Sequence, residues 1–344
     1  MLSKLVTCAL TALPPEPAHN VTIKLLASPF APQALFKADP MLETSVAGLS
    51  LPNPLGMAAG FDKNAEVPDA LLRLGFGFAE VGAVTPRPQP GNPSPRVFRL
   101  RDEAAVINRY GFNNDGLDII RTRLEARRDR PGVVGINLGA NKDSEDRGLD
   151  YVTGLQALED CVDFLTVNVS SPNTEGLRAL QAGAELKALL TRVMDARRTA
   201  KPVFVKVAPD LTENDIADIT AAVLESGVNG MIVSNTTLDR DGVSGPYAHE
   251  KGGLSGAPLF EKSTRVLRAF AEETKGQVPL IGVGGVRSAA DVLAKIKAGA
   301  SAVQLYTALI YQGPGLVADI VRELPVLLRA EGFKAVDDAV GAEL

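Results

Sequence analysis

LIGVGGVRSAADVLAKIKAGASAVQL, residues 280–305, has the pattern of a strand, a glycine turn, a helix and a second strand. Leu280–Val283 and Ala302–Leu305 are short, mainly apolar runs, which is typical of buried parallel strands. Ser288 is a helix-capping residue type and stands directly before the helical stretch Ala289–Ala298. This order of elements predicts one βαβ unit of a parallel sheet.

The same alternation recurs along the chain from Pro54 onward. The helical stretches between the apolar runs include Ala65–Leu74, Glu185–Arg197, Asn214–Ser226, Lys262–Glu273 and Ala289–Ala298. The strand candidates are Leu55–Ala59, Phe78–Ala83, Val133–Leu138, Phe164–Val169, Val203–Val207, Gly230–Ser234, Leu280–Val283 and Ala302–Leu305. These βα repeats predict an α/β protein with a TIM-type (β/α)8 barrel, and a doubly wound open sheet is the alternative.

The composition argues against several classes of protein. A net charge of −5 without a basic stripe disfavours a nucleic-acid-binding protein. The two cysteines, Cys8 and Cys161, form no CxxC pair. With His19 and His249 as the only histidines, we expect no metal site and no Ser/His/Asp triad. His249, in a polar stretch, is expected to be a surface residue.

Residues 1–40 differ in pattern from residues 41–344, so we expect a small N-terminal helical hairpin ahead of a barrel domain. Pro14 ends the first predicted helix, and a second is expected over about Ala18–Ala27. Apolar residues fall on one face of the first helix: Leu2, Leu5, Val6, Ala9, Leu10 and Leu13.

Two interpretations of this hairpin remain open. Most amphipathic helices cover the core of their own domain, and the pattern alone favours that reading. The segment is also slightly basic, which suits an amphipathic patch on an anionic membrane. A signal peptide is disfavoured because Pro14 and Pro15 follow without a small-residue cleavage site. No apolar run reaches the ~18 residues of a transmembrane helix.

Polar residues stand just past the ends of the predicted strands, where TIM barrels build their catalytic face. They are Lys63, Asn137, Asn168, Ser171, Lys206, Asn235, Thr236, Gly284, Gly285, Tyr306 and Thr307. Two connections, Thr85–Gly116 and Asp239–Pro258, exceed the usual loop length and are interpreted as site-building loops or lids. Stability alone gives no reason for this placement, so the pattern predicts an enzyme.

The glycine turn suits a phosphate group. Gly284 and Gly285 allow backbone N–H groups to approach closely, and a helix N-terminus follows. Tyr306 and Thr307, after the last strand, are placed to close the same pocket. No GxGxxG motif with a following acidic residue is present, which disfavours a Rossmann NAD site.

Lys206 lies inside an apolar strand, where a buried lysine is costly without a negative partner. One interpretation is a strand-end lysine that reaches solvent. The other is a flavin ring, which gains negative charge near N1 on reduction. A group of asparagines supplies donors and acceptors without charge, as a flat pyrimidine-like ligand requires, although asparagine is also common in turns. They are Asn108, Asn113, Asn114, Asn168, Asn173 and Asn235.

Taken together, these motifs resemble the quinone-dependent class of the dihydroorotate dehydrogenase family. The matching segments, in the order of the family, are AAGFDKNAE, VGAVTPRPQPGNPSPRVFRL, INRYGFNN, GINLGANK, VNVSSPNT, VKVAPDL, SNTT, GGLSG, IGVGGV and QLYTAL, over residues ~58 to 307. The resemblance implies oxidation of dihydroorotate to orotate in pyrimidine (UMP) biosynthesis, with hydride transfer to FMN and then electron transfer to a membrane quinone.

The resemblance also implies residue roles. Ser171 is the expected general base, in place of the cysteine of the other branch, and Lys63, Lys206 and Asn168 are the further expected catalytic residues. The implied substrate contacts are Lys63, Asn108, Arg109, Tyr110, Gly111, Phe112, Asn168, Asn173, Asn235 and Thr236. The implied FMN contacts are Ala59, Gly60, Phe61, Asp62, Lys63, Ala83, Asn137, Asn168, Lys206, Ser234, Ser255, Gly256, Val283, Gly284, Gly285, Tyr306 and Thr307.

One position departs from the family pattern. Ala83 replaces a Ser or Thr that is common there, so a hydroxyl contact to FMN is lost while a backbone contact is retained. In the family, two N-terminal helices form an apolar quinone tunnel on the membrane, and His19 and Arg99 match positions that line it. For Arg99 a surface salt bridge is the alternative. The resemblance therefore implies a monomeric peripheral membrane protein, on the cytoplasmic side of the inner membrane if the source is bacterial.

Two other functions are weighed against this one. A second type of FMN barrel, similar to tRNA dihydrouridine synthase, needs a basic RNA surface that the net charge does not indicate. A non-catalytic flavin-binding barrel would not need a base such as Ser171 beside the ring.

Overall fold

The computed structural model describes residues 2–34 and 37–344. The side chains of residues 2–6 lie outside the described part, and with them the predicted apolar face of Leu2, Leu5 and Val6. The N-terminal hairpin is present as α1 (Leu2–Ala12) and α2 (Pro15–Ala27). The second helix begins three residues earlier than predicted, because proline is well tolerated at the first position of a helix.

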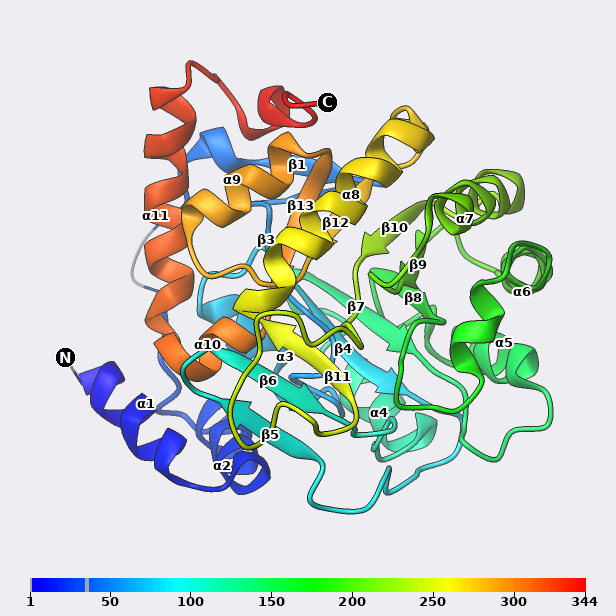
Figure 1. The fold of residues 1–344 in the computed structure, drawn as a ribbon, viewed down its shortest axis with the longest axis horizontal. Helices are drawn as coiled ribbons and strands as arrows, with labels where there is room; N and C mark the ends of the chain where they lie inside the picture. Colours follow the sequence, from blue (N-terminus) through cyan, green and yellow to red (C-terminus); the bar gives the residue numbers. More distant parts are fainter. Residues whose placement is uncertain (1, 35–36) are drawn as a thin grey trace.

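Eight parallel strands close into a barrel, which confirms the predicted TIM fold and rules out the open sheet (Figure 1). Around the barrel the order is β3-β4-β7-β8-β9-β10-β12-β13. Their bounds are Leu55–Met57, Phe78–Val84, Val133–Leu138, Phe164–Asn168, Val203–Val207, Gly230–Val233, Leu280–Val283 and Ala300–Leu305. Each differs from its predicted range by two residues or fewer at either end.

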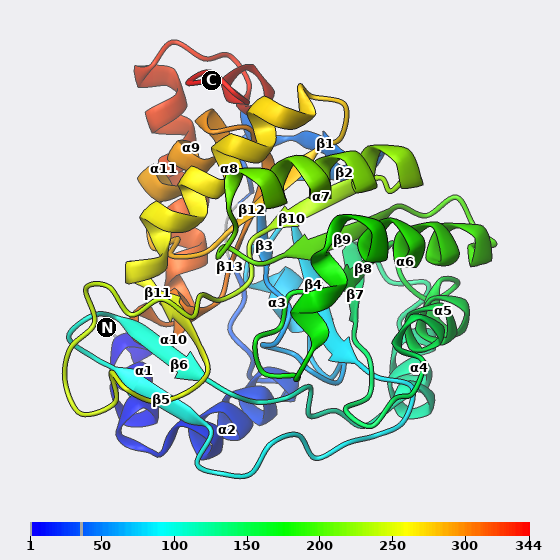
Figure 2. The same cartoon turned by 45° about the vertical axis from the view of Figure 1, so that its right-hand side comes forward.

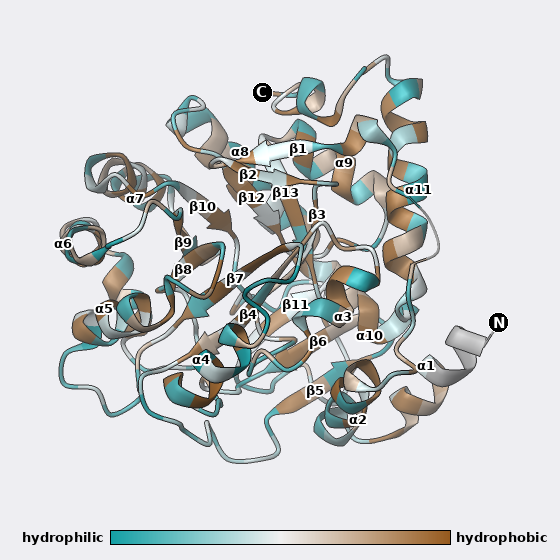
Figure 3. Ribbon diagram, turned by 180° about the vertical axis from the view of Figure 1, so that it is seen from behind, coloured by the Kyte–Doolittle hydropathy of each residue, from teal (hydrophilic) through white to brown (hydrophobic). Residues whose placement is uncertain are grey.

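Helices surround the barrel, as Figure 2 shows for α5 to α9 and α11. The α-helices after the hairpin are α3 (Pro68–Arg73), α4 (Leu117–Glu125), α5 (Arg147–Leu158), α6 (Gly183–Ala196), α7 (Glu213–Ser226), α8 (Phe260–Thr274), α9 (Ala289–Lys297), α10 (Thr307–Gln312) and α11 (Gly315–Ala330). The short 3-10 helices are η1 (Pro40–Leu42), η2 (Leu177–Gln181), η3 (Ala257–Leu259) and η4 (Val336–Ala339). Figure 3 shows hydrophobic residues concentrated on strands such as β4 and β10.

The predicted start of one helix was wrong. The stretch Ala65–Leu74 becomes helical only at Pro68, because the buried carboxylate of Asp62 accepts hydrogen bonds from the backbone N–H groups of Glu66 and Val67. Those bonds hold the preceding residues in a turn.

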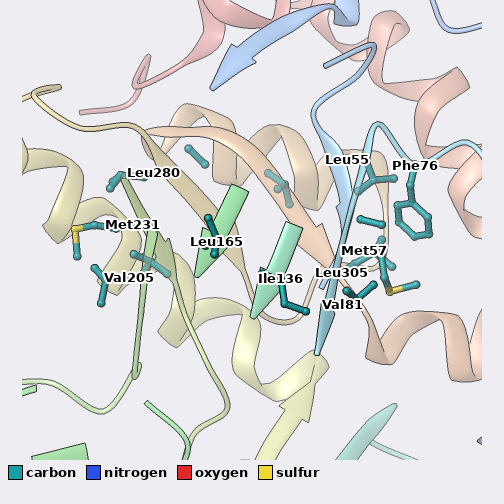
Figure 4. Close-up of a cluster of buried hydrophobic side chains, with 14 of the residues drawn as sticks. Leu55, Met57, Phe76, Val81, Ile136, Leu165, Val205, Met231, Leu280 and Leu305 are labelled. Carbon is teal, nitrogen blue, oxygen red and sulfur yellow. The ribbon is translucent and has the colours of Figure 1, made fainter. Parts of the chain in front are cut away.

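The core has two layers, one on each side of the barrel wall. The outer layer lies between the strands and the helices, and every barrel strand contributes to it (Figure 4). The labelled strand residues in this layer are Leu55, Met57, Val81, Ile136, Leu165, Val205, Met231, Leu280 and Leu305. Because both faces of the strands are buried, the sequence shows continuous apolar runs rather than alternation.

The inner layer is built from aromatic rings set against glycines. Phe164 packs edge-to-face on Phe204, with 5.6 Å between the ring centroids. A Cβ atom on Gly135 would lie 2.2 Å from the Phe164 ring, and one on Gly230 would lie 2.6 Å from the Phe204 ring. The rings therefore occupy the space that side chains on the neighbouring strands would need. Phe78 has the same relation to Gly56.

Two small antiparallel sheets were not predicted. The hairpin of β1 (Thr44–Val46) and β2 (Leu49–Leu51) precedes β3, and its Val46 and Leu51 join the inner layer of the barrel core. The second sheet has the order β11-β6-β5, with bounds Gly253–Gly256, Ala105–Asn108 and Val97–Leu100. The two long connections, interpreted as loops or lids, thus contribute three paired strands.

The N-terminal hairpin is attached to β5 (Figures 1 and 2). Arg96 forms an ion pair with Glu16 at 2.9 Å. Arg99 donates hydrogen bonds to the carbonyl oxygens of Thr11 and Leu13, where α1 ends. A cation at a helix C-terminus is favourable because the last carbonyls carry partial negative charge. Within residues 2–34 and 37–344, no helix is long and apolar enough to cross a bilayer.

The substitution Gly135→Ala should destabilise the barrel by roughly 1–3 kcal/mol, because the added methyl group overpacks the Phe164 ring. The thermal unfolding midpoint measures the effect. Gly315→Ala is the matched control, since nothing lies within 4 Å of a Cβ atom there, and it should change stability by no more than about 0.5 kcal/mol. Equal midpoints for the two variants would contradict the packing argument.

Candidate active site

One cavity of about 350 Å³ lies at the C-terminal ends of the barrel strands and extends to the N-terminal hairpin. It collects nearly all the residues singled out in the sequence. These are His19, Ala59, Gly60, Phe61, Lys63, Ala83, Arg99, Asn108, Tyr110, Gly111, Phe112, Asn137, Asn168, Ser171, Asn173, Lys206, Ser234, Asn235, Thr236, Ser255, Gly256, Val283, Gly284, Gly285, Tyr306 and Thr307.

Two predicted site residues do not line the cavity. Asp62 is fully buried and its carboxylate holds the turn before α3. Arg109 forms an ion pair with Glu250 at 2.6 Å and stacks over the ring of Phe98, with 4.6 Å from its guanidinium carbon to the ring centroid. The side chains of Asp62 and Arg109 therefore stabilise the surrounding structure and do not line the cavity.

One end of the cavity has the geometry of a phosphate site. Gly284 and Gly285 adopt φ values of +116° and +74°, which favour glycine. Ser288 then caps α9, its side chain accepting the backbone N–H of Asp291. The hydroxyls of Thr307 and Ser255 lie 2.8 Å apart, so the last strand and the second small sheet meet here. Backbone N–H groups at a glycine turn and a helix N-terminus suit an anion.

A chain of buried polar side chains crosses the barrel interior. The carboxylate of Glu80 accepts hydrogen bonds from Asn137 Nδ2 and Gln304 Nε2, both at 2.7 Å. Asn168 Nδ2 donates to Asn137 Oδ1 at 2.8 Å, and Asn235 Nδ2 lies 3.4 Å from Asn168 Oδ1. The hydroxyl of Tyr151 on α5 bonds the carbonyl of Asn168 at 2.7 Å. These hydrogen bonds fix the orientation of the Asn137, Asn168 and Asn235 amides at the cavity wall.

Glu80 was missed by the sequence analysis. It is fully buried in the middle of β4. The available signal was an acidic residue within the apolar run FAEVGAV, the same kind of signal that drew attention to Lys206.

Lys206 is buried at the wall of the cavity, not extended to solvent. Burial lowers its pKa, and the negative charge of Glu80 acts in the opposite direction. The arrangement is a cation with a carboxylate in the same barrel interior, which reduces the cost of burying either charge alone.

Ser171 and Asn173 stand at the other wall. Ser171 Oγ accepts the backbone N–H of Asn173 at 3.3 Å, and Asn173 Nδ2 donates to Asn108 Oδ1 at 3.3 Å. Asn113 Oδ1, on the same cavity, is buried and has no hydrogen-bond partner within the described chain. A buried acceptor without a partner indicates a donor on a bound molecule.

Lys63 connects this wall to the hairpin. Its Nζ lies 4.3 Å from the ring centroid of Tyr110 and 3.4 Å from Nε2 of His19 on α2. Burial lowers the pKa of Lys63 to about 8. Burial, and then the charge of Lys63, lowers the pKa of His19 to about 3, so the imidazole stays neutral near pH 7. A neutral imidazole is able to accept the Lys63 hydrogen bond.

The branch of the cavity at the hairpin is mostly apolar. Its apolar lining residues include Leu10, Ala18, Leu25, Leu26, Pro32, Leu309 and Pro314, and the hairpin also contributes Thr7, Thr11 and Thr22. The ring of Phe61 stands edge-to-face between His19 and Tyr306, with 5.5 Å between centroids on each side. Arg99 also lines this branch, and its role as a cap of α1 replaces the surface salt bridge considered from the sequence. The described residues contain no cluster of His, Cys, Asp and Glu suited to a metal ion.

The fold and this cavity define a TIM-barrel enzyme with its site at the C-terminal face. Residues 41–328 match the sequence model of a family described as dihydroorotate dehydrogenase. The chain belongs to the dihydroorotate dehydrogenase family of oxidoreductases, in its quinone-dependent branch.

Two curated relatives support this placement over nearly the full length of the chain. A dihydroorotate dehydrogenase (quinone) of Parvibaculum lavamentivorans is 55% identical over 336 residues, covering 97% of both chains. One of Cereibacter sphaeroides is 54% identical over 344 residues, covering 99% of this chain and 97% of the relative. The alternatives, a tRNA dihydrouridine synthase-like barrel and a non-catalytic flavin-binding barrel, are not favoured.

Solved structures agree with the fold. A DHODH of Eimeria tenella in complex with ferulenol superposes with a TM-score of 0.92 at 40% identity, covering 96% of each chain. Its ligand-free form gives a TM-score of 0.93 at 41% identity, covering 96% of this chain and 99% of the other.

The substitution Glu80→Gln should destabilise the protein by roughly 1–3 kcal/mol, because it removes the negative charge that acts on buried Lys206 and replaces one of the oxygens that accept from Asn137 and Gln304. The thermal unfolding midpoints of Glu80→Gln, Lys206→Met and the double variant test this. We expect the double variant to lose less stability than the sum of the two single losses. Strictly additive losses would show that the two charges are not coupled.

Proposed function

We propose that the protein oxidises dihydroorotate to orotate in pyrimidine biosynthesis, with FMN as bound cofactor and a membrane quinone as final electron acceptor. The observation that carries the proposal is one cavity that joins three features. The Gly284–Gly285 turn, called the phosphate-type turn below, lies at one end, and Ser171 and the asparagines line the wall. An apolar branch extends to the hairpin. Bound FMN would supply the redox chemistry, namely acceptance of the hydride from C6 of dihydroorotate and transfer of the electrons to the quinone.

The residues present fit FMN. The turn at Gly284 and Gly285, with Thr307 and Ser255 beside it, would hold the phosphate. Lys206 and Asn137 would contact the ring, where a buried cation stabilises negative charge. The remaining proposed contacts are Ala59, Gly60, Phe61, Lys63, Ala83, Asn168, Ser234, Gly256, Val283 and Tyr306.

Four asparagines that line the cavity, Asn108, Asn168, Asn173 and Asn235, would hold the substrate. Asn108 and Asn173 are linked to each other, and Asn168 and Asn235 form a second linked pair. The amides of Asn108, Asn168 and Asn173 retain donor or acceptor capacity for the N–H and C=O groups of a pyrimidine. The Asn235 amide is fully used by Asn168, Ser170 and Thr236, so it would have to exchange one of these bonds to contact the substrate. Lys63 would attract the substrate carboxylate. Arg109, whose side chain is bound to Glu250, would contribute through its backbone alone.

Ser171 would remove the proton from C5. A serine hydroxyl is a weak base on its own, so Ser171 would take the C5 proton as it passes its hydroxyl proton to a water relay or to a neighbouring polar group. The backbone N–H of Asn173 donates to Ser171 Oγ, which stabilises negative charge on that oxygen. Burial of the side chain keeps competing water away.

The N-terminal segment, residues 1–40, would be the quinone and membrane module, and residues 41–344 the catalytic barrel. In the described part of the N-terminal segment, the large exposed apolar side chains include Leu13, Val21, Leu25 and Phe30, and Phe30 is 93% exposed. Such side chains favour an interfacial position on a bilayer. His19 and Arg99 would line the route from this surface to the cofactor. We propose a monomer bound at the cytoplasmic face of the inner membrane of a bacterium.

The substitution Ser171→Ala should leave flavin binding intact and slow the bleaching of the flavin by dihydroorotate by roughly 10²–10⁴-fold at neutral pH. Anaerobic stopped-flow absorbance measures the rate, and the visible spectrum of the purified variant is the control for bound flavin. A rate equal to that of the unmodified protein would remove Ser171 from its role as base.

The substitution Phe30→Asp should reduce binding to anionic liposomes several-fold, because it places a charge on the surface proposed to enter the lipid. Co-sedimentation with vesicles measures binding. Val326→Asp is the control, since Val326 on α11 is also exposed and apolar, at 61%, and lies outside the hairpin. Equal losses in both variants, or none in either, would contradict a specific role of the hairpin.

A further inference from the structure

A second buried lysine lies behind the phosphate-type turn. Lys295 on α9 has no exposed surface, although it is a lysine on a surface helix. Its Nζ donates to the hydroxyl oxygens of Ser263 at 2.9 Å and Thr264 at 3.0 Å, both on α8. Its Nζ also lies 5.1 Å from the centroid of the Phe260 ring. Within the described residues Lys295 forms no ion pair, and the negative charges that act on it are those of Asp291 and Glu261. A buried cation with neutral partners alone costs stability, so its retention needs a reason.

Ser263 connects this lysine to the turn. Its hydroxyl lies 3.0 Å from the carbonyl oxygen of Gly284 and 3.0 Å from that of Phe260. Because the hydroxyl accepts from Lys295, its own proton is directed to one of these carbonyls. One hydroxyl thus lies within hydrogen-bond distance of the Lys295 ammonium group, the Gly284 carbonyl of the turn and the Phe260 carbonyl at the start of α8.

The turn is in close contact with this support. A Cβ atom on Gly284 would lie 2.7 Å from Ser263 Oγ, and one on Gly285 would lie 2.5 Å from the backbone of Phe260. Lys295 Cδ would lie 3.2 Å from a Cβ atom on Gly282, just before the turn. The turn thus rests directly on the start of α8, with the lysine and the serine filling the space behind it.

We propose that Lys295 is a positioning residue of the phosphate site, which holds the Gly284–Gly285 turn through Ser263 and adds positive charge behind it. The inference rests on the proposed function, since it assumes that this turn binds the phosphate of a flavin nucleotide. A carbonyl held from behind keeps the adjoining N–H groups directed into the cavity. The charge then acts on a phosphate dianion through a medium that contains little water.

The titration of the group agrees with this role. Burial lowers the pKa of Lys295 to about 7. A bound anion favours the protonated form, so the phosphate and the ammonium group stabilise each other.

The test compares FMN with riboflavin, which has the same ring system without the phosphate. Dissociation constants are measured on the full-length chain, stripped of flavin, by quenching of flavin fluorescence. The substitution Lys295→Met should weaken FMN binding at least about tenfold and leave riboflavin binding nearly unchanged. Ser263→Ala, which keeps the lysine, should produce a smaller loss of the same selectivity. Lys297→Met is the matched control, because Lys297 lies on the same helix and pairs with Glu331 and Glu343 at the surface.

The outcomes separate this inference from the proposed function. If the unmodified protein shows no preference for FMN over riboflavin, the FMN assignment fails. If it prefers FMN and Lys295→Met keeps the same preference, Lys295 has no role at the phosphate site. Equal weakening of both flavins in Lys295→Met or Ser263→Ala would assign the pair to general packing and overturn the proposal. Should Lys295→Met not fold, the flavin selectivity of Ser263→Ala decides.

Discussion

The polar half of the barrel depends on one buried carboxylate. Glu80 provides the negative charge that offsets Lys206, and its two oxygens hold Asn137 and Gln304. Asn137 in turn holds Asn168, so the orientation of the cavity wall follows from a residue that does not line it. Apolar side chains in the same positions would often give an equally or more stable barrel. The burial of Glu80 and Lys206 is therefore best explained by the cavity at the C-terminal ends of the strands, which needs a fixed cation and fixed amides.

Stability and chemistry are separated along the barrel axis. In the N-terminal half, rings such as Phe164 fill the space left by glycines, and Val46 and Leu51 of the small hairpin complete the apolar layer. In the C-terminal half, the strands end in residues with hydrogen-bonding capacity, and the loops beyond them form the cavity. The rigid apolar layer in the N-terminal half of the barrel holds the strands in place. Side chains that project from these strands, such as Lys206, therefore have fixed positions at the cavity.

The parts of the structure that sequence could predict are those with local causes. All eight barrel strands were predicted because each is a short apolar run with its own boundaries, and the polar residues just past their ends identified part of the cavity wall. Other wall residues, such as Arg99 and Ser255, were named only through the family resemblance. The pairing of β11 with β6 was missed because Gly253 and Asn108 lie far apart in the sequence, and no local pattern records such a pairing. The hairpin of β5 and β6 is local, and its signal, the apolar residues of VFRL and AVIN, was overlooked within a connection interpreted as a loop. Arg109 was assigned to the substrate from its motif, but a partner distant in sequence, Glu250, takes its side chain. Glu80 needed the strand register to be placed near Lys206, since one acidic residue in a strand gives no indication of what it faces.

The hairpin is held by its polar ends, and this determines what its faces can do. Arg99 and Arg101 bind the carbonyls at the end of α1, and Glu16 at the start of α2 pairs with Arg96. The carbonyls of Thr11 and Leu13 are thereby paired with guanidinium groups, which fixes this end of the hairpin against β5. The side of the hairpin that faces the barrel, including the neutral His19, closes the cavity. Phe30, which follows α2, is exposed. In the proposed function, an apolar quinone would thus pass from lipid to the cofactor along one segment, without crossing bulk water.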